Sequence, residues 1–206
     1  MIGEEVRHQV AIAGQVRDEQ TGKLIEGVQI IIAKAPPQFL ELLNVKAKQY
    51  GDRWPSMVER EDRTRTTTEG HFHFMDLPNG SYTVHATVPD LGSRYSTVSK
   101  DVAILRDANG NLKLTAVNLA LPPTTIKGQV RGRDSNPVVM AEVKIKGSGE
   151  RTYTNNQGRY VLTQVEVGSR TIKVSAQGYK DVSTSVVLTR AGTVENMDVN
   201  LVPATS

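Results

Sequence analysis

The chain has no cysteine and few aromatic residues, and each shortage excludes classes of function. Without cysteine there is no disulfide, thiolate-bound metal, iron–sulfur cluster or cysteine nucleophile. Phe, Trp and Tyr make up 5% of the 206 residues, which argues against a base-stacking RNA surface or a broad aromatic platform for sugars. The sequence also has no apolar run long enough to cross a membrane as a helix. We therefore expect no membrane span.

The N-terminal residues and the charge distribution give two further expectations. Met1–His8 has no basic stretch followed by an apolar run, which is the pattern of a secretory signal. We therefore expect a cytoplasmic protein. The net charge is +3, with 14 basic and 15 acidic residues in 1–121 and 11 basic and 7 acidic residues in 122–206. The basic residues of the second half are scattered, so we expect no nucleic-acid partner.

An internal repeat is the strongest pattern in the chain. Gly14–Arg17 recurs as Gly128–Arg131, and Thr68–Val84 corresponds to Asn156–Ile172. Each repeat contains about seven short strands rich in β-branched residues, which is typical of a β-sandwich. Pro122-Pro123 stands between the repeats, where a strand must stop. The sequence thus predicts an all-β chain with two domains, over residues 1–121 and 124–206.

Several local features are predicted from the same repeats. Gly70 and Gly158 should adopt positive φ before a strand. Leu77–Gly80 is interpreted as the tight turn of a hairpin, and Asp107–Gly110 as a second one. The apolar run Gly27–Ala33 is typical of a strand buried on both faces. The predicted core positions of the two domains are Phe72, Phe74, Leu77, Tyr82 and Val84, and Tyr160, Leu162, Val165 and Ile172.

The repeated motifs resemble a known family. Both repeats carry G-x-V, then a V-x-I strand, then a G-x-F or G-x-Y strand followed by L/V-x-x-G, and the resemblance covers nearly the whole chain outside residues 36–63. This pattern resembles the carboxypeptidase regulatory-like domain, whose fold is transthyretin-like (prealbumin-like). The resemblance implies two tandem transthyretin-like Greek-key β-sandwiches. In that family the domain sits beside a zinc peptidase or decorates surface and adhesion proteins.

Three histidines are the candidates for a metal site. His71 and His73 alternate on one strand and should share a face. If the Leu77–Gly80 turn pairs this strand with the next, His85 lies on that face too, and three imidazoles could bind zinc or nickel. The alternative is a solvated polar strand face, because no carboxylate is placed to orient the rings and the second repeat lacks the histidines. We expect no metal.

Catalytic motifs are missing from the sequence. It contains no G-x-S-x-G turn, no H-E-x-x-H pair, and neither a Walker loop nor a G-x-G-x-x-G loop. The peptidase zinc motif that accompanies the domain in its family is missing as well. We therefore expect a non-enzymatic protein with no cofactor and no small-molecule substrate.

Residues 36–63 are an insertion that only the first repeat carries. Their apolar residues fall at helical spacing, Pro36-Pro37 precedes them and Gly51 follows them, so the segment predicts a helix. One interpretation is a helix that caps its own sandwich. The other is a helix that docks onto another protein, since inserted segments commonly carry function. On the second interpretation, four side chains are predicted to bind a partner: Phe39, Leu43, Tyr50 and Trp54.

These features lead to one hypothesis and an alternative. The hypothesis is a structural or adaptor subunit of a larger intracellular assembly with protein partners. Its narrower form is an accessory baseplate, spike or cap component of a phage-tail-like contractile injection particle. The alternative is a surface adhesion or carbohydrate-binding module, which would need exposed aromatic side chains on one face.

Overall fold

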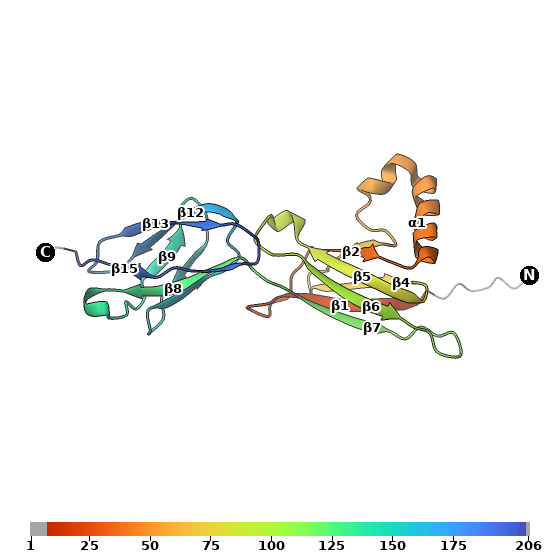
Figure 1. The fold of residues 1–206 in the computed structure, drawn as a ribbon, viewed down its shortest axis with the longest axis horizontal. Helices are drawn as coiled ribbons and strands as arrows, with labels where there is room; N and C mark the ends of the chain where they lie inside the picture. The colour runs from red at the N-terminus through yellow and green to blue at the C-terminus, as the bar shows by residue number, and fades with distance from the viewer. Residues whose placement is uncertain (1–7, 205–206) are drawn as a thin grey trace, which may run out of the picture. The chain divides into compact units, whose positions relative to one another are not determined.

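The computed structural model describes residues 8–204 and divides the chain into two compact units (Figure 1). The first unit comprises Met1–Asp90 and Thr97–Leu121, and the second comprises Leu91–Ser96 and Pro122–Ser206. Residues 91–96, which the repeat pattern assigns to the first sandwich, thus cluster with the second unit. There the main-chain N–H of Thr124 donates to the carbonyl oxygen of Arg94 at 2.8 Å, and the Arg94 side chain pairs with Glu150.

The first unit is a sandwich of two sheets with strand orders β4-β1-β7 and β3-β2-β5-β6. Its strands are β1 (Val10–Asp18), β2 (Gln29–Lys34), β3 (Arg63–Arg65), β4 (His71–Met75), β5 (Gly80–Thr87), β6 (Val98–Ile104) and β7 (Thr115–Leu121). The helical segments are α1 (Pro37–Tyr50), η1 (Gly51–Ser56) and η2 (Pro89–Leu91). Strand β7 returns to lie parallel to β1, over Ile12–Asp18 and Thr115–Leu121.

The second unit repeats this plan, with strand orders β11-β8-β14 and β10-β9-β12-β13, and with β15 also pairing with β8. Its strands are β8 (Thr125–Arg131), β9 (Glu142–Ile145), β10 (Arg151–Tyr153), β11 (Arg159–Leu162), β12 (Gly168–Ser175), β13 (Val182–Leu188), β14 (Val194–Asn196) and β15 (Val199–Asn200). A single turn of 3-10 helix, η3 (Arg133–Ser135), follows β8. The last two strands, β14 and β15, run parallel to β8, the first strand of this unit. The predicted all-β class, with two tandem sandwiches and a helical insertion in the first, is confirmed.

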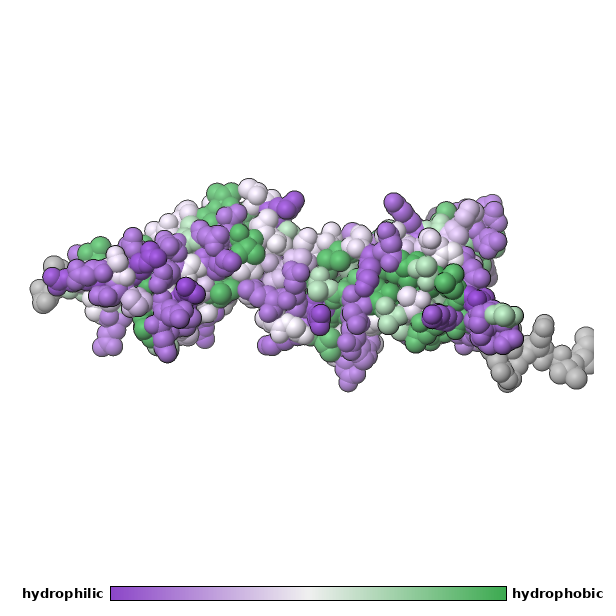
Figure 2. Space-filling model, turned by 60° about the horizontal axis from the view of Figure 1, so that its bottom comes forward, coloured by the Kyte–Doolittle hydropathy of each residue, from purple (hydrophilic) through white to green (hydrophobic). Residues whose placement is uncertain are grey.

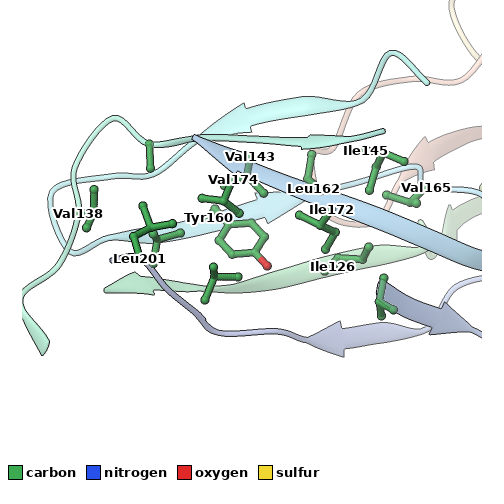
Figure 3. Close-up of a cluster of buried hydrophobic side chains, with 14 of the residues drawn as sticks. Ile126, Val138, Val143, Ile145, Tyr160, Leu162, Val165, Ile172, Val174 and Leu201 are labelled. Atoms are coloured by element: carbon green, nitrogen blue, oxygen red, sulfur yellow. The ribbon is translucent and has the colours of Figure 1, made fainter. Parts of the chain in front are cut away.

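Each sandwich encloses its own hydrophobic core. All nine predicted core residues are at most 3% exposed. In the second unit, Tyr160 and Leu162 of β11 point inward with Ile172 and Val174 of β12, as Figure 3 shows. At 20 to 33 cal/mol per Å² of apolar surface, burial of such side chains is the main stabilising term for each unit.

The first strands of the two units lie unusually close to the last ones. A Cβ atom added to Gly14 would lie 1.7 Å from the carbonyl oxygen of Val117, and one added to Gly128 would lie 1.8 Å from that of Met197. No side chain fits into such a gap. The repeated G-x-V motif therefore marks the place where the parallel closing strand packs against the first strand.

The connection between β4 and β5 differs from the sequence prediction. Leu77–Gly80 does not close a hairpin, because β4 lies in the sheet with β1, while β5 lies in the other sheet with β2 and β6. The chain crosses between sheets after Asp76, which has φ 56°, and the equivalent Gln164 has φ 58°. The turn at Asp107–Gly110 does close a short hairpin, because Arg106 and Leu112 form an antiparallel bridge and the main-chain N–H of Lys113 donates to the carbonyl oxygen of Leu105 at 3.0 Å. Beyond this bridge the prediction is wrong, since β6 and β7 belong to different sheets.

Strand β2 also differs from its prediction. It spans Gln29–Lys34, and only Ile30 and Ile32 are buried, whereas Ile31 is half-buried. The strand therefore has one face in the core, as usual in a sandwich. Its outer face is partly covered, which is why an apolar residue such as Ile31 occurs there too. Gly70 and Gly158 have φ of 67° and 69°, which confirms the prediction of positive φ.

A buried threonine ties two loop segments together in each unit. The hydroxyl of Thr66 donates to the carbonyl oxygen of Ile25 at 2.7 Å and accepts from the main-chain N–H of Val28 at 2.9 Å. The hydroxyl of Thr154 makes the same two bonds, to Val138 at 2.6 Å and from Ala141 at 2.9 Å.

Within residues 8–204, no helix is long and apolar enough to cross a membrane.

Candidate functional site

The insertion folds as the helix that the sequence predicts. Helix α1 begins at Pro37, where the missing N–H of proline costs no helical hydrogen bond, and it ends before Gly51, which has φ 57°. The 3-10 helix η1 continues the chain to Ser56. In Figure 1, α1 projects from the first sandwich on the side away from β7.

Phe39 attaches the start of the helix to the sandwich. It is 1% exposed and lies edge-on against Tyr82 of β5, with the ring centroids 5.8 Å apart. Phe39, one of the four side chains predicted to bind a partner, is therefore inside the sandwich and not on its surface. The reason is physical: the end of the sandwich leaves the Tyr82 ring uncovered, and the first turn of α1 closes over it.

The other three predicted binding residues are half-buried. Leu43, Tyr50 and Trp54 lie on the inner side of the insertion, and the rings of Tyr50 and Trp54 stack with centroids 5.9 Å apart. The guanidinium of Arg60 lies 4.5 Å from the centroid of the Trp54 ring. These contacts hold the insertion together. The binding role predicted for these residues stays a prediction.

A second attachment fixes the end of the insertion. Arg60 binds the Asp62 carboxylate with two hydrogen bonds of 2.8 Å each and donates to the carbonyl oxygen of Trp54 at 3.1 Å. The main-chain N–H of Ile32 in β2 donates to the carbonyl oxygen of Asp62 at 2.9 Å. Paired, bidentate geometry of this kind is among the stronger side-chain interactions.

A pocket of about 440 Å³ lies between the insertion and the sandwich. Its size falls within the range of ligand-binding pockets. One wall comes from strand β4 and the residue after it, and the other from α1 and the segment that leads into β3. The lining residues are His8, Phe39, Leu42, Tyr50, Met57, Glu59, Arg60, Glu61, Arg63, Thr64, His73, Phe74, Met75 and Asp76.

Two of the acidic side chains around the pocket have side-chain partners. His8 Nδ1 lies 2.5 Å from the Asp76 carboxylate, and that hydrogen bond lowers the pKa of Asp76 below its usual value, with help from the main-chain N–H of Gln9. Glu61 pairs with Lys46 at 3.2 Å. Arg60 is already committed to Asp62, as described above.

Arg63, the other arginine that lines the pocket, has weaker contacts than Arg60. Its Nη1 makes two long bonds of 3.4 Å, to the carbonyl oxygens of Pro55 and Met57. Its Nε is buried and has no hydrogen-bond partner among the described residues. A buried donor without an acceptor is costly, so this guanidinium is the group in the pocket most in need of a partner.

The surface beside the pocket is apolar. Val10 and Met75 are directly opposite in the register of β1 and β4 and are 40% and 49% exposed. On the insertion itself, Leu40 and Val45 are 48% and 62% exposed. Figure 2 shows hydrophobic residues gathered on one face of the first sandwich. Exposed apolar surface is common at sites of protein–protein contact.

The three candidate histidines do not come together. His71 and His73 lie on β4, whereas His85 lies on β5 in the other sheet, so the prediction that they share a face is wrong. His71 contacts the side-chain amide of Gln15, and His85 Nδ1 lies 2.8 Å from the Ser99 hydroxyl. Across residues 8–204, no group of three His, Asp or Glu side chains is placed to hold a metal ion.

The architecture defines the class of the protein as a pair of transthyretin-like β-sandwiches. The family model for the carboxypeptidase regulatory-like domain matches residues 11–116 and 125–202. Those segments span most of the sequence, and the chain belongs to that family, in two tandem copies.

Individual relatives are more distant. Carboxypeptidase D of Drosophila melanogaster is 27% identical over 163 residues, which cover 72% of this chain and only 12% of that protein. The shaft pilin SpaA of Lactobacillus rhamnosus GG is similar over 97% of this chain and 99% of the pilin, at 14% identity and a TM-score of 0.43. The Bacillus anthracis TIE protein is similar over 94% of this chain and 34% of its own, at 12% identity and a TM-score of 0.42. TM-scores this low say nothing about function.

Proposed function

We propose that this protein is a non-enzymatic structural or adaptor subunit that binds another protein through the insertion of its first sandwich. The observation that carries the proposal is the exposed apolar surface of α1, at Leu40 and Val45, beside an apolar pocket. The second sandwich has the same strands without the insertion. The family scaffold therefore does not need this segment to fold, and apolar side chains held in water need another reason to be there.

The proposal includes a setting for the protein. In its narrower form the protein works in the cytoplasm, as a baseplate, spike or cap accessory of a phage-tail-like contractile injection particle. Gentle lysis and sedimentation test this directly, because the protein should then migrate with a large cytosolic particle. Protease accessibility on intact cells would instead favour the alternative, a surface adhesion or carbohydrate-binding module.

The experiment that tests docking changes the exposed side of α1 and leaves its attachment alone. The double variant Leu40→Glu, Val45→Glu should fold normally, because both side chains are largely in water and surface substitutions change stability by about 0.5 kcal/mol or less. It should no longer migrate with the assembly. The matched control is Val139→Glu, Val187→Glu in the second unit, where the two side chains are 46% and 61% exposed. If both variants stay in the assembly, the insertion is not the docking element.

A further inference from the structure

Strand β4 is an edge strand that borders the pocket. Among the residues that the structure describes, it pairs only with β1, in the sheet order β4-β1-β7. The main-chain N–H of Val16 donates to the carbonyl oxygen of Gly70 at 2.9 Å, and Gly14 is opposite Phe72. Antiparallel pairs alternate between hydrogen-bonded and non-hydrogen-bonded positions. Phe72 and Phe74 therefore direct their main-chain groups toward β1, and His73 directs its N–H and C=O toward the open edge.

The insertion forms the second wall of the pocket beside this open edge. His73, Phe74 and Met75 line the pocket from β4, and Leu42 and Tyr50 line it from the helical side. In the second unit, β9 and β10 pair around a short turn at Gly147–Gly149, so no comparable wall faces β11. An edge strand beside an apolar pocket is the arrangement that captures an extended peptide by strand addition.

Charge indicates what the captured peptide carries. Of the two arginines that line the pocket, Arg60 is paired with Asp62, while the Nε of Arg63 has no acceptor among the residues described. A carboxylate is the natural partner for a guanidinium that lines a pocket, since it offers two oxygens in matching geometry. The complementary ligand is therefore an apolar side chain next to an acidic group.

We propose that β4 takes up an extended acidic–apolar segment of a partner protein as an additional strand, with a bulky apolar side chain in the pocket and a carboxylate on Arg63. This inference rests on the proposed docking function and names its chemistry. A peptide accounts for the whole site better than a small carboxylate does. Only a peptide uses the main-chain groups of His73, and the exposed Val10–Met75 pair beside the pocket extends the contact along the strand.

The test separates main-chain pairing from side-chain contact at one position. His73→Pro removes the outward N–H, and proline is tolerated on the open side of edge strands. His73→Ala removes the imidazole and keeps the N–H. The probe is a random heptapeptide display library panned against the full chain, followed by affinity measurements with the enriched peptides on the wild type and both variants.

The expected result has three parts. Enriched peptides contain a bulky apolar residue near Asp or Glu, they bind the wild type, and their affinity for His73→Pro is roughly tenfold or more below their affinity for His73→Ala, which lacks the same imidazole but keeps the N–H. Arg63→Gln should weaken them too, and should favour peptides without the acidic residue. Protection of the His73 amide from hydrogen exchange on peptide binding gives an independent measurement, which does not depend on the proline variant folding.

Two results would overturn the proposal. If His73→Pro binds the peptides as tightly as His73→Ala does, the site is a side-chain pocket without strand addition. The same conclusion follows if an amidated small apolar compound binds the wild type as tightly as the peptides do. Absence of enriched peptides together with self-association that His73→Pro abolishes would assign the edge to a second copy of this chain. Neither result would affect docking through Leu40 and Val45, so the two proposals fail separately.

Discussion

The ring of Phe39 lies edge-on against that of Tyr82, at 73° between the ring planes, and joins the helical insertion to the core of the first sandwich. Phe39 is the one residue of α1 that is buried. The hydroxyl of Tyr82 in turn donates to the carbonyl oxygen of Pro78 at 2.8 Å. The helix is therefore attached to the sandwich at one end, and it presents Leu40 and Val45 to solvent.

Phe39→Ala should detach the insertion. Buried phenylalanine-to-alanine changes cost about 3 to 5 kcal/mol, and here the loss falls on the contact between α1 and Tyr82. Leu40→Ala, one residue further, should change the free energy of unfolding by less than about 0.5 kcal/mol, because that side chain is 48% exposed. Urea unfolding and hydrogen exchange across residues 37–50 measure both effects. Equal stability of the two variants would mean that the insertion docks elsewhere.

Thr66→Val should destabilise the first unit by about 1 to 3 kcal/mol, because it leaves the carbonyl of Ile25 and the N–H of Val28 buried without their partner. Thr154→Val should cost the second unit a similar amount. The control is Thr68→Val, at an exposed position in the turn before β4. Thermal unfolding measures the loss of stability in each variant, and hydrogen exchange shows in which unit that loss occurs. Equal losses of stability in the control and in the buried variants would mean that these hydrogen bonds do not stabilise the two units.

Gly14→Ala should prevent the first sandwich from folding. The added methyl group would lie 1.7 Å from the Val117 carbonyl oxygen, and the main chain of β7 cannot move away without breaking its pairing with β1. Gly149→Ala is the matched control, since its methyl group would meet nothing within 4 Å and its φ is not positive. Soluble expression and circular dichroism compare the two. A well-folded Gly14→Ala protein would show that the closing strand is not fixed by this contact.

Two buried phenols make stability sensitive to high pH. Burial raises the pKa of both Tyr82 and Tyr160 to about 12, whereas an unfolded tyrosine titrates near 10. Between these values the unfolded chain loses protons that the folded chain keeps. The free energy of unfolding should therefore be independent of these groups below pH 10 and fall as pH rises from 10 to 12.

Tyr82→Phe and Tyr160→Phe should each flatten that decline, even though each loses a hydrogen bond at neutral pH. Urea unfolding at several pH values, with tyrosinate absorbance recorded in parallel, measures the slope. An unchanged slope in both variants would place the alkaline transition on other groups.

Much of the fold follows from the repeat alone. Alternation placed Phe72 and Phe74, and likewise Tyr160 and Leu162, in the cores, because a strand turns successive side chains to opposite faces. Gly70 and Gly158 were predictable from turn chemistry, and α1 from Pro37 and Gly51 at its ends. These features depend on local geometry, which is encoded within a few residues.

The candidate site was less predictable. Tyr50 could be chosen from helical spacing and size, but Arg63 and Met75 had no local signal, because their place in the pocket depends on which strand lies beside which. The same gap produced the mistaken placement of His85. A four-residue connection can close a hairpin or cross to the other sheet, and the local pattern does not distinguish the two.

The sequence by itself determined the two sandwiches, the positions of their strands and the helical nature of the insertion, since periodicity, turn residues and internal repetition are all short-range signals. Only the tertiary structure decided that Phe39 is buried, that β4 is an edge strand and that Arg63 faces a pocket beside it. Each of these depends on contacts between segments far apart in the chain. Such contacts form only when the whole core is buried at once, and no local pattern specifies which pairs of segments will meet.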